Sequence, residues 1–357
     1  MTVGFIGSGS VVRSIHLPTL ARLPDLFRVG HICDVDLAAA RAVAGTVGAR
    51  WSSSVTELLQ DSAVDVVAVC SPHQLHTDHV VAACEAGVRA ILCEKPLATS
   101  VADAARIAAT ARRTGTSVIL GSMHLFDPAW AFLRQHFGPL RGDGGGGVVG
   151  DGGGRGGATT VRSNIMLPFN DRFERWATEP DGTGPLPEVD HSTAAGRAAS
   201  ITIQLLGLAI HDLPLVRAVA PQWREVEVIS ADVMEPLGYR VQLRAGPTLI
   251  ELSGGFRDHW QTEWEFAASD EHSIARVEFT PSFVQAGSGT ARITDADTTW
   301  DFPGSDSNGY EGEWRSLAQT TMSDANGSAR LEGYVADLEF ALVVADAVAT
   351  HIEEEQQ

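Results

Sequence analysis

The chain has 357 residues, more than one hydrophobic core usually supports, so we expect two domains. Its formal net charge of −19 disfavours nucleic acids and anionic membranes as partners, because both bind basic surfaces. No apolar run reaches the roughly 18 residues that span a bilayer, and a first strand starting at residue 2 or 3 leaves no room for a signal peptide. We therefore expect a cytoplasmic protein.

Neither a disulfide nor a metal site is expected. The four cysteines contain no Cys-x-x-Cys pair and three of them lie in apolar strands, so we expect buried, reduced thiols. The 12 histidines include no His-x-x-x-His step with a nearby carboxylate, the spacing typical of a zinc site.

A short apolar strand, residues 2–6, is predicted to run into a glycine-rich turn, and helical spacing follows through Leu20. In a dinucleotide site the first glycine permits the tight turn, and the second lets the backbone approach the pyrophosphate. Val12 occupies the position of the third glycine of this fingerprint, which allows close packing of helix and strand. We assign this segment to cofactor binding: Gly7, Ser8, Gly9, Ser10, Val11 and Val12.

Asp34 ends a second predicted strand, Arg28–Cys33, a little over 20 residues after the turn. A carboxylate there can accept hydrogen bonds from the ribose hydroxyls of adenosine. Val35 and Asp36 follow it, so no adjacent arginine neutralises a 2′-phosphate, and NAD is favoured over NADP. Asp34 could alternatively cap the helix that starts near Leu37.

Two further strands end in polar residues. Strand 64–70 is followed by a loop and then by a helix over 77–86. Strand 90–93 is followed by Glu94 and Lys95, and Pro96 ends it. With strand 117–121, this alternation of strands and helices predicts a parallel sheet with right-handed crossovers, whose carboxyl edge binds ligands. We therefore assign these residues to the cofactor: Ser71, Pro72, His73, His76, Glu94 and Lys95. Glu94 and Lys95 could alternatively be a solvated surface pair.

Together these motifs resemble the glucose–fructose oxidoreductase / inositol dehydrogenase family over about the first third of the chain. The residues that carry the resemblance are Gly7-x-Gly9 with His16 and Leu20, Asp34, Ser71-Pro72 with His76, Ala86-Gly87, and Cys93-Glu94-Lys95-Pro96-Leu97. The resemblance implies an α/β fold with an amino-terminal NAD(P)-binding Rossmann domain, residues 1–124. An α+β domain with a large, mostly antiparallel open sheet is implied for residues 125–357. That sheet commonly mediates oligomer formation in the family, so we expect a homodimer or homotetramer.

The second half of the chain shows alternating, strand-like segments without regular intervening helices, typical of an antiparallel sheet. They are 159–165, 226–232, 239–244, 248–253, 262–267 and 273–279. Helices are predicted over 127–137 and 334–353. The glycine-rich tract 142–157 is expected to be a flexible loop.

The apolar segment Leu205–Leu215, read as a helix, carries His211. In the resembled family this region reads Asp-x-Gly-x-His, with the histidine beside the nicotinamide, and His211 falls on that position. Gly207 replaces the aspartate, which leaves the proton relay open. Histidine exchanges protons near neutral pH, and a lysine ammonium stabilises a developing alkoxide. We assign His211 as general acid/base and Lys95 as its substrate-orienting or proton-sharing partner, although His211 could instead be a core histidine.

Three more residues are candidates for substrate binding. His124 follows the last parallel strand. Arg162 and Asn164 are two apart on a strand and therefore share one face, which could be the substrate face or the solvent face.

The predicted function is NAD(P)-dependent interconversion of a secondary alcohol and a ketone on a cyclic polyol, sugar or sugar derivative. Two alternatives remain: redox-neutral, NAD-assisted glycoside cleavage or elimination, and a non-catalytic, dinucleotide-responsive regulatory protein.

Overall fold

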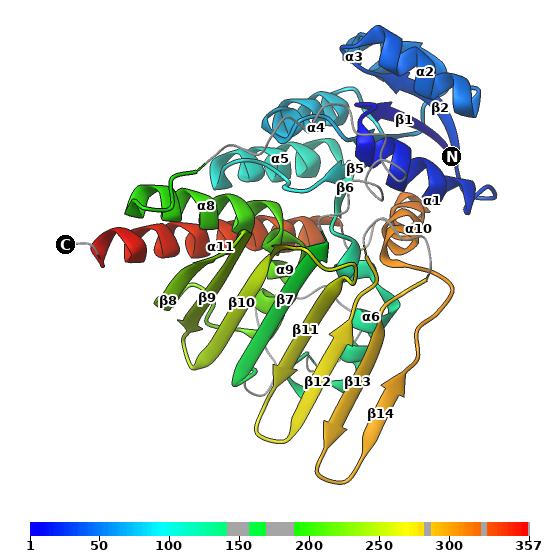
Figure 1. Ribbon diagram of the computed structural model, residues 1–357. Coiled ribbons are helices and arrows are strands. Elements are labelled where there is room, and N and C mark those ends of the chain that lie inside the picture. The colour runs from blue at the N-terminus through cyan, green and yellow to red at the C-terminus, as the bar shows by residue number, and fades with distance from the viewer. Residues whose placement is uncertain (141–156, 169–188, 282–286, 323–326, 356–357) are drawn as a thin grey trace. The chain divides into compact units, whose positions relative to one another are not determined.

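The computed structural model describes residues 1–140, 157–168, 189–281, 287–322 and 327–355, and these divide into two units (Figure 1). The first unit comprises residues 1–123 and 309–338. The second comprises the described parts of 124–308 and 339–357. The predicted glycine-rich loop falls outside the described residues, apart from Gly157.

The first unit is built on a six-stranded sheet in the order β3-β2-β1-β4-β5-β6, and every strand pair in it is parallel. Its strands are β1 (Thr2–Ile6), β2 (Arg28–Cys33), β3 (Arg50–Ser52), β4 (Val66–Val69), β5 (Ala90–Glu94) and β6 (Ser117–Gly121). The strand order reverses between β1 and β4, and at such a switch point the carboxyl ends of the strands form a ligand crevice. The predicted Rossmann fold is confirmed.

Helices cover this sheet. They are α1 (Leu17–Ala21), α2 (Leu37–Val47), α3 (Val55–Leu59), α4 (His76–Glu85), α5 (Val101–Thr114) and α10 (Gly309–Met322), with the short turns η1 (Val12–His16) and η2 (His73–Leu75). Of these, α2 and α4 lie close to the predicted helices, whereas α3 and α10 were not predicted. The helix predicted directly after the glycine turn begins as a π-helix, η1, in which Val12 is fully buried. The helix α10 packs on β5 and β6 although it lies about 190 residues later in the chain.

The second unit is built on an eight-stranded sheet in the order β14-β13-β12-β11-β7-β10-β9-β8 (Figure 1). Its strands are β7 (Thr160–Pro168), β8 (Val226–Met234), β9 (Leu237–Ala245), β10 (Thr248–Arg257), β11 (Glu263–Ser269), β12 (Ser273–Glu278), β13 (Thr290–Asp295) and β14 (Thr299–Phe302). All neighbouring pairs are antiparallel except β7 and β10. The predicted large, mostly antiparallel sheet is confirmed.

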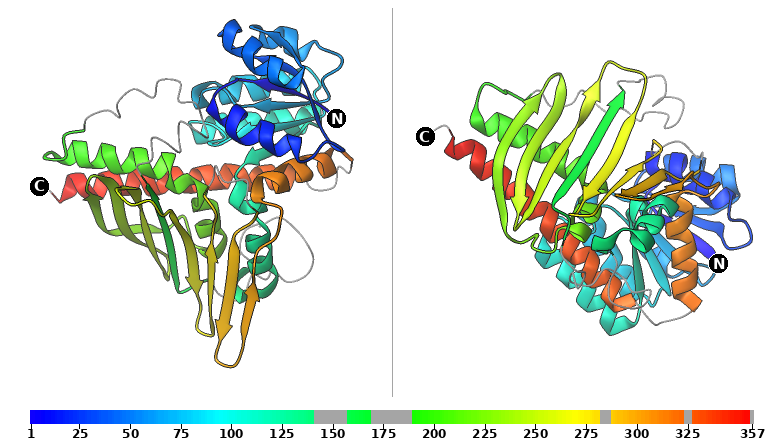
Figure 2. Two further views of the ribbon diagram at one scale, coloured as in Figure 1. Left: turned by 45° about the vertical axis from the view of Figure 1, so that its right-hand side comes forward. Right: turned by 90° about the horizontal axis from the view of Figure 1, so that it is seen from below.

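Among the described residues, helices lie against one face of this sheet and none lies against the other (Figure 2). They are α6 (Pro128–His136), α8 (Ala194–Gly207), α9 (Leu213–Val219) and the part of α11 (Gly327–Glu354) from Glu339 on, with the short turns η3 (Met123–Phe126), η4 (Gly138–Leu140) and η5 (Ala209–His211). The alternation along β7 shows the two faces. Val161, Ser163 and Ile165 are buried, whereas Arg162 is exposed.

The single apolar helix predicted over 205–215 is wrong. Helix α8 ends at Gly207, the 3₁₀ turn η5 follows, and α9 restarts at Leu213 with Pro214 in its first turn. Proline is favoured there because its fixed φ suits the start of a helix and its missing N–H has no partner to lose. The break places His211 and Asp212 in an irregular turn.

No single helix among the described residues is long and apolar enough to cross a membrane. The segments Ala194–His211 and Leu213–Val219 meet that length and composition together, as a pair bent by 73°.

Candidate active site

The glycine turn lies at the switch point of the parallel sheet. Gly7 has a φ of +104°, which glycine adopts without a Cβ clash, and its N–H donates to the carbonyl of Cys33 at 2.8 Å. A Cβ on Gly9, by contrast, would have no atom within 4 Å. Gly9 and Ser10 are exposed. The backbone here is therefore open to a ligand, as a dinucleotide pyrophosphate requires.

Asp34 is tied to this turn. Its Oδ2 accepts hydrogen bonds from the backbone N–H of Ser8 at 2.7 Å and from the Ser8 hydroxyl at 2.8 Å. The cap of α2 is Asp36, which accepts from the N–H groups of Ala38 and Ala39. The alternative role of Asp34 as a helix cap is therefore wrong. Val35 beside it is 93% exposed and carries no charge.

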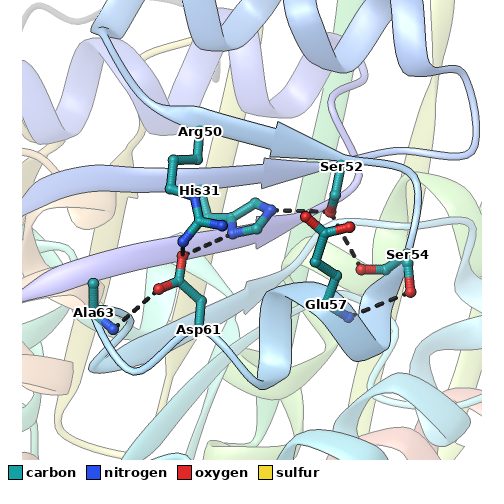
Figure 3. A network of polar contacts seen from close by, with 7 residues as sticks. All are labelled: His31, Arg50, Ser52, Ser54, Glu57, Asp61 and Ala63. Atoms are coloured by element: carbon teal, nitrogen blue, oxygen red, sulfur yellow. Dashed lines mark hydrogen bonds and ion pairs between the residues drawn. The ribbon is translucent and has the colours of Figure 1, made fainter.

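A buried polar network supports the strands behind Asp34 (Figure 3). The His31 ring lies 3.0 Å from Oδ2 of Asp61 through Nδ1 and 2.9 Å from the Ser52 hydroxyl through Nε2, and Arg50 pairs with the same Asp61 oxygen at 2.8 Å. The Ser52 carbonyl in turn accepts from the N–H of Asp34 at 3.2 Å. Since His31 and Ser52 are both buried, this Asp–His–Ser arrangement fixes β2 against β3 and does not meet a substrate.

His76 joins the ends of β4 and β5. Its Nδ1 lies 2.7 Å from the Pro96 carbonyl and its Nε2 lies 2.9 Å from the Ser71 carbonyl. Burial lowers the pKa of His76 despite these two acceptors. Pro72 and His73, in the same loop, are exposed. His76 therefore fixes the loop after β4 to the segment after β5, whereas the side chains of Pro72 and His73 are exposed to solvent.

Glu94 ends β5 and Lys95 follows it, and both are half-buried rather than fully solvated. The Glu94 carboxylate lies 2.9 Å from Nε2 of His16 and accepts from the backbone N–H of Lys95 at 3.2 Å. Burial raises the pKa of Glu94, but the hydrogen bond from His16 and the charges of His16 and Lys95 hold it below its usual value. Burial lowers the pKa of Lys95, although the charge of Glu94 opposes this shift.

Lys95 is the single lysine in the 357-residue sequence, and the rest of its 26 lysines and arginines are arginines. Arginine stays protonated at any accessible pH, whereas a buried lysine readily changes its pKa. Among its lysines and arginines the chain therefore has one side chain, Lys95, that can lose its proton at an accessible pH.

Helix α10 contributes two buried residues that sequence reasoning did not find. Trp314 donates its indole N–H to Nδ1 of His16 at 3.2 Å, which leaves the proton of a neutral His16 on Nε2, facing Glu94. Glu313 is fully buried, and burial with the nearby charge of Glu94 raises its pKa well above its usual value. The buried positions Trp314, Leu317 and Ala318 show helical spacing, a signal that predicts the helix but not the domain on which it packs.

The second unit holds a separate buried cluster around Asp212. Its carboxylate, 1% exposed, accepts from Nδ1 of His124 at 2.7 Å, from the Ser163 hydroxyl at 2.8 Å and from the Trp264 indole at 3.0 Å. These donors come from η3, β7 and β11. A carboxylate with such a set of donors is fully satisfied in its ionised form.

Aromatic rings fix the orientation of His124. Its imidazole stacks on Phe279, with ring centroids 3.7 Å apart and planes 8° apart, and meets Trp264 edge-on at 4.7 Å. The His211 ring lies 6.5 Å from the His124 ring and 5.5 Å from that of Trp264. The cluster thus brings together two candidate residues, His124 and His211, that the sequence placed apart.

Arg162 and Asn164 lie on the other face of the sheet. Arg162 pairs with Glu251 at 2.8 Å, and the Asn164 amide oxygen accepts from the Ser253 hydroxyl at 2.8 Å. Ser163, between them, points to the buried face and bonds Asp212. The strand pleat therefore separates Arg162 and Asn164 from His124 and His211, and the structure gives no shared substrate face to the four predicted residues.

The parallel sheet, with the glycine turn at its carboxyl edge, is typical of a Rossmann nucleotide-binding domain. The eight-stranded sheet forms a second, open-sheet domain. Residues 1–122 match the sequence model of an oxidoreductase family with an NAD-binding Rossmann fold. Over these residues the chain is similar to the glucose–fructose oxidoreductase / inositol dehydrogenase family that the sequence motifs resemble.

Similar sequences include inositol 2-dehydrogenase 3 of Saccharopolyspora erythraea, 36% identical over 134 residues that cover 37% of this chain and 39% of the relative. The D-glucoside 3-dehydrogenase of Escherichia coli is 34% identical over 137 residues, 38% of either protein. The chain therefore matches about two fifths of the length of these relatives.

Solved structures match over nearly the whole chain. A UDP-N-acetylglucosamine 3-dehydrogenase from Acidithiobacillus ferrooxidans has a TM-score of 0.71 at 18% identity and 99% coverage of both chains. A 3-ketoreductase from Actinomadura kijaniata, in complex with NADP and TDP-benzene, has a TM-score of 0.68 at 19% identity, covering 98% of this chain and 97% of that one. At such identity the likeness shows the fold, including that of the second unit.

Proposed function

We propose that the chain is an NAD-dependent oxidoreductase that interconverts a secondary alcohol and a ketone on a cyclic polyol, sugar or sugar derivative. The observation that carries this proposal is the convergence of Gly9, Asp34 and Lys95 on the carboxyl edge of one parallel sheet. The family match of residues 1–122 supports the dinucleotide. The named activities of the relatives, on inositol and on D-glucosides, support a polyol or sugar substrate.

The preference for NAD over NADP rests on Asp34. Its carboxylate, held by Ser8, suits ribose hydroxyls that donate hydrogen bonds and repels a 2′-phosphate. The exposed neighbour Val35 offers no positive charge. The Actinomadura kijaniata structure contains NADP, but that protein is only 19% identical to this chain. The proposed preference for NAD therefore rests on Asp34 of this chain and not on the cofactor of that structure.

A bound nicotinamide dinucleotide would supply the hydride acceptor or donor. The turn Gly7–Val12, Asp34, the loop of Ser71, Pro72, His73 and His76, and Glu94 would hold it. Lys95 would orient the substrate hydroxyl and stabilise the negative charge that develops on its oxygen, because its side chain is half-buried and its charge is less screened than in bulk water. His211, by its register in the family motif, would take the hydroxyl proton.

We propose further that the enzyme is cytoplasmic and assembles as a homodimer or homotetramer through the open face of its large sheet. That face bears cross-strand ion pairs, Arg162 with Glu251 and Arg257 with Glu263, and a groove of about 760 Å³ over β7, β9, β10 and β11. Arg162 and Asn164 belong to this face, so their polar groups support a role in association better than one in binding substrate.

Mass spectrometry of the purified protein for a co-purified dinucleotide, followed by turnover against a panel of cyclic polyols, sugars and keto-sugars, tests the function. Ketone formation matched by reduced dinucleotide is expected. A product without net reduced dinucleotide would point to the redox-neutral reaction. Dinucleotide binding without any turnover would point to a regulatory protein.

A further inference from the structure

We propose that Trp314 is a positioning residue for Lys95: its indole N–H holds His16 as the neutral tautomer that donates to Glu94, so that Glu94 keeps a full negative charge next to Lys95. The inference rests on the proposed oxidoreductase function, in which Lys95 meets the substrate, and deepens it. All four residues belong to the first unit. Trp314 lies on α10, 298 residues after the histidine to which it donates.

The first step of the argument is the one-way chemistry of the indole. Its N–H donates and cannot accept, so Nδ1 of His16, 3.2 Å away, must present a lone pair. A protonated ring carries a hydrogen on both nitrogens and would turn one N–H toward another. Both side chains are fully buried, so water does not replace either partner. The contact therefore favours a neutral His16 near neutral pH, with its proton on Nε2.

Packing fixes the indole in this direction. Trp314 meets the Phe27 ring edge-on, with ring centroids 5.1 Å apart, and the Phe5 ring at 6.2 Å. Its plane is nearly perpendicular to that of His16, at 83°. The donor is therefore held at Nδ1 by the core of the parallel-sheet unit.

The second step is the position of Glu94. Its Oε1 lies 2.9 Å from Nε2 of His16, and its Oε2 accepts from the backbone N–H of Lys95 at 3.2 Å. The residue opposite it on β6 is Gly121, where a Cβ would lie 3.1 Å from Oε1. The carboxylate thus has a defined place at the end of β5, and its charge raises the pKa of Lys95 against the effect of burial.

A second buried histidine–carboxylate pair in the same unit shows what Trp314 adds. The His31 ring lies 3.0 Å from Asp61, and its other nitrogen lies 2.9 Å from the Ser52 hydroxyl. A hydroxyl can donate or accept, so His31 can carry one proton or two without losing this hydrogen bond. A nearby carboxylate favours the charged form of a histidine. At His16 the indole opposes that form, because it only donates.

Other titratable groups near Glu94 leave its charge uncompensated. In the described part of the first unit they are Cys70, Cys93, His76 and Glu313. Burial raises the pKa of the two thiols and of the second carboxyl and lowers that of the imidazole, which favours the uncharged form of each. A neutral His16 therefore leaves the carboxylate of Glu94 to the ammonium of Lys95.

The consequence for the proposed reaction is the charge of Lys95. An ammonium orients a hydroxyl and stabilises the negative charge that develops on its oxygen, whereas a neutral amine lacks the charge to do so. Burial lowers the pKa of Lys95, and the charge of Glu94 extends the pH range in which the ammonium persists. In this scheme Trp314 acts through His16 and Glu94 and not on the substrate.

The first test follows the titration of Lys95 by carbon-13 NMR without added cofactor, since the single lysine gives one side-chain signal. Glu94→Gln removes the carboxylate and should lower the pKa of Lys95. Trp314→Phe keeps an aromatic ring but removes the N–H, and should lower this pKa most of the way to the Glu94→Gln value. His16 can then take a second proton, or turn a lone pair to Glu94 and make that carboxylate take one, and either change cancels the negative charge.

The matched control is Trp130→Phe on α6 of the second unit. Trp130 is as fully buried as Trp314, but among the described residues its indole N–H has no hydrogen-bond partner. The same substitution there removes the same atoms without removing a hydrogen bond, so the Lys95 titration should keep its wild-type midpoint. An unchanged titration in folded Trp314→Phe, or an equal shift in both tryptophan variants, would overturn the inference.

A second measurement decides the case even where Trp314→Phe does not fold. Nitrogen-15 NMR of histidine-labelled wild-type protein near neutral pH, with His16→Gln to identify the signal, should show a neutral His16 ring protonated at Nε2. A ring protonated at Nδ1, or on both nitrogens, would show that the indole does not set its state and would overturn the inference.

The kinetic test uses a substrate found in the panel. The alkaline limb of the kcat/KM profile, assigned to loss of the Lys95 proton, should move to lower pH in Trp314→Phe by as much as the NMR titration moves, with the plateau near its wild-type value. A lower plateau with an unmoved limb would show a merely structural role and overturn the inference. Dinucleotide binding without any turnover would overturn the proposed function alone, because the Lys95 titration would still test the action of Trp314.

Discussion

The turn after β1 passes so close to the end of β4 that a Cβ on Gly7 would lie 2.5 Å from the carbonyl oxygen of Cys70. This contact joins the two strands on either side of the switch point and so shapes the site proposed for the dinucleotide. Gly9, two residues later, has no such neighbour. The two glycines of one motif therefore have separable roles.

Alanine at these two positions should separate folding from binding. Gly7→Ala meets a backbone oxygen at positive φ and should destabilise the protein by more than about 1 kcal/mol. Gly9→Ala should leave the unfolding free energy nearly unchanged and lower NAD(H) affinity at least roughly tenfold, because its methyl group points into open space near the proposed pyrophosphate. Urea unfolding and calorimetric titration check both. Unchanged NAD(H) affinity in Gly9→Ala would contradict the assigned turn.

Asp34 should decide between the two dinucleotides. We expect NAD(H) to bind at least roughly tenfold more tightly than NADP(H), since a 2′-phosphate would meet the carboxylate that Ser8 holds in place. Asp34→Ser with Val35→Arg should move the preference toward NADP(H), because it removes the repulsion and adds a cation. Titration calorimetry with both cofactors measures this, and equal affinities in the wild-type protein would exclude the assigned role.

Lys95 should be catalytic through its proton as well as its charge. Lys95→Met and Lys95→Arg should both lower kcat by roughly 10²–10⁴-fold with little change in cofactor affinity, although the arginine keeps the charge. Because the sequence contains one lysine, carbon-13 lysine labelling gives a side-chain signal that needs no assignment. Its titration should lie below the ordinary lysine pKa, as burial dictates. Full activity in Lys95→Arg would limit the role of Lys95 to charge.

Asp61 should make stability depend on pH at the acid end. Burial by itself raises the pKa of Asp61. Hydrogen bonds from Ala63 and His31 and the charge of Arg50 together lower it by more, so the pKa in the folded state lies below that in the unfolded state. Such a group stabilises the fold above its unfolded pKa, and the contribution is lost as pH falls through the folded pKa.

Asp61→Asn should therefore lower the unfolding free energy near neutral pH and match the wild-type protein more closely between about pH 4 and pH 2. Urea unfolding across this range measures the difference. Asp78→Asn is the control, since its ion pair with Arg106 is exposed and should contribute little. A constant difference between wild type and Asp61→Asn at all pH values would show that the ionisation of Asp61 does not matter.

The first unit was predictable from sequence because its signals are local. Apart from β3 (Arg50–Ser52), which was not predicted, the strands of the parallel sheet are short and mostly apolar, and Gly7, Asp34 and Lys95 follow strand ends directly. Parallel strands joined by right-handed crossovers bring their carboxyl ends to one edge whatever the loops do. The sequence therefore determined both the Rossmann fold and the edge on which its candidate residues lie.

Other features depended on contacts between distant residues, which no local pattern encodes. His124 and Asp212 are 88 residues apart, and only the packing of η3, η5 and β11 makes one the partner of the other. The pleat of β7 alone shows that Ser163, not Arg162 or Asn164, faces this pair. Sequence spacing sets which side chains share a face, but the layer packed against that face decides whether it is buried or open, and so what its residues do.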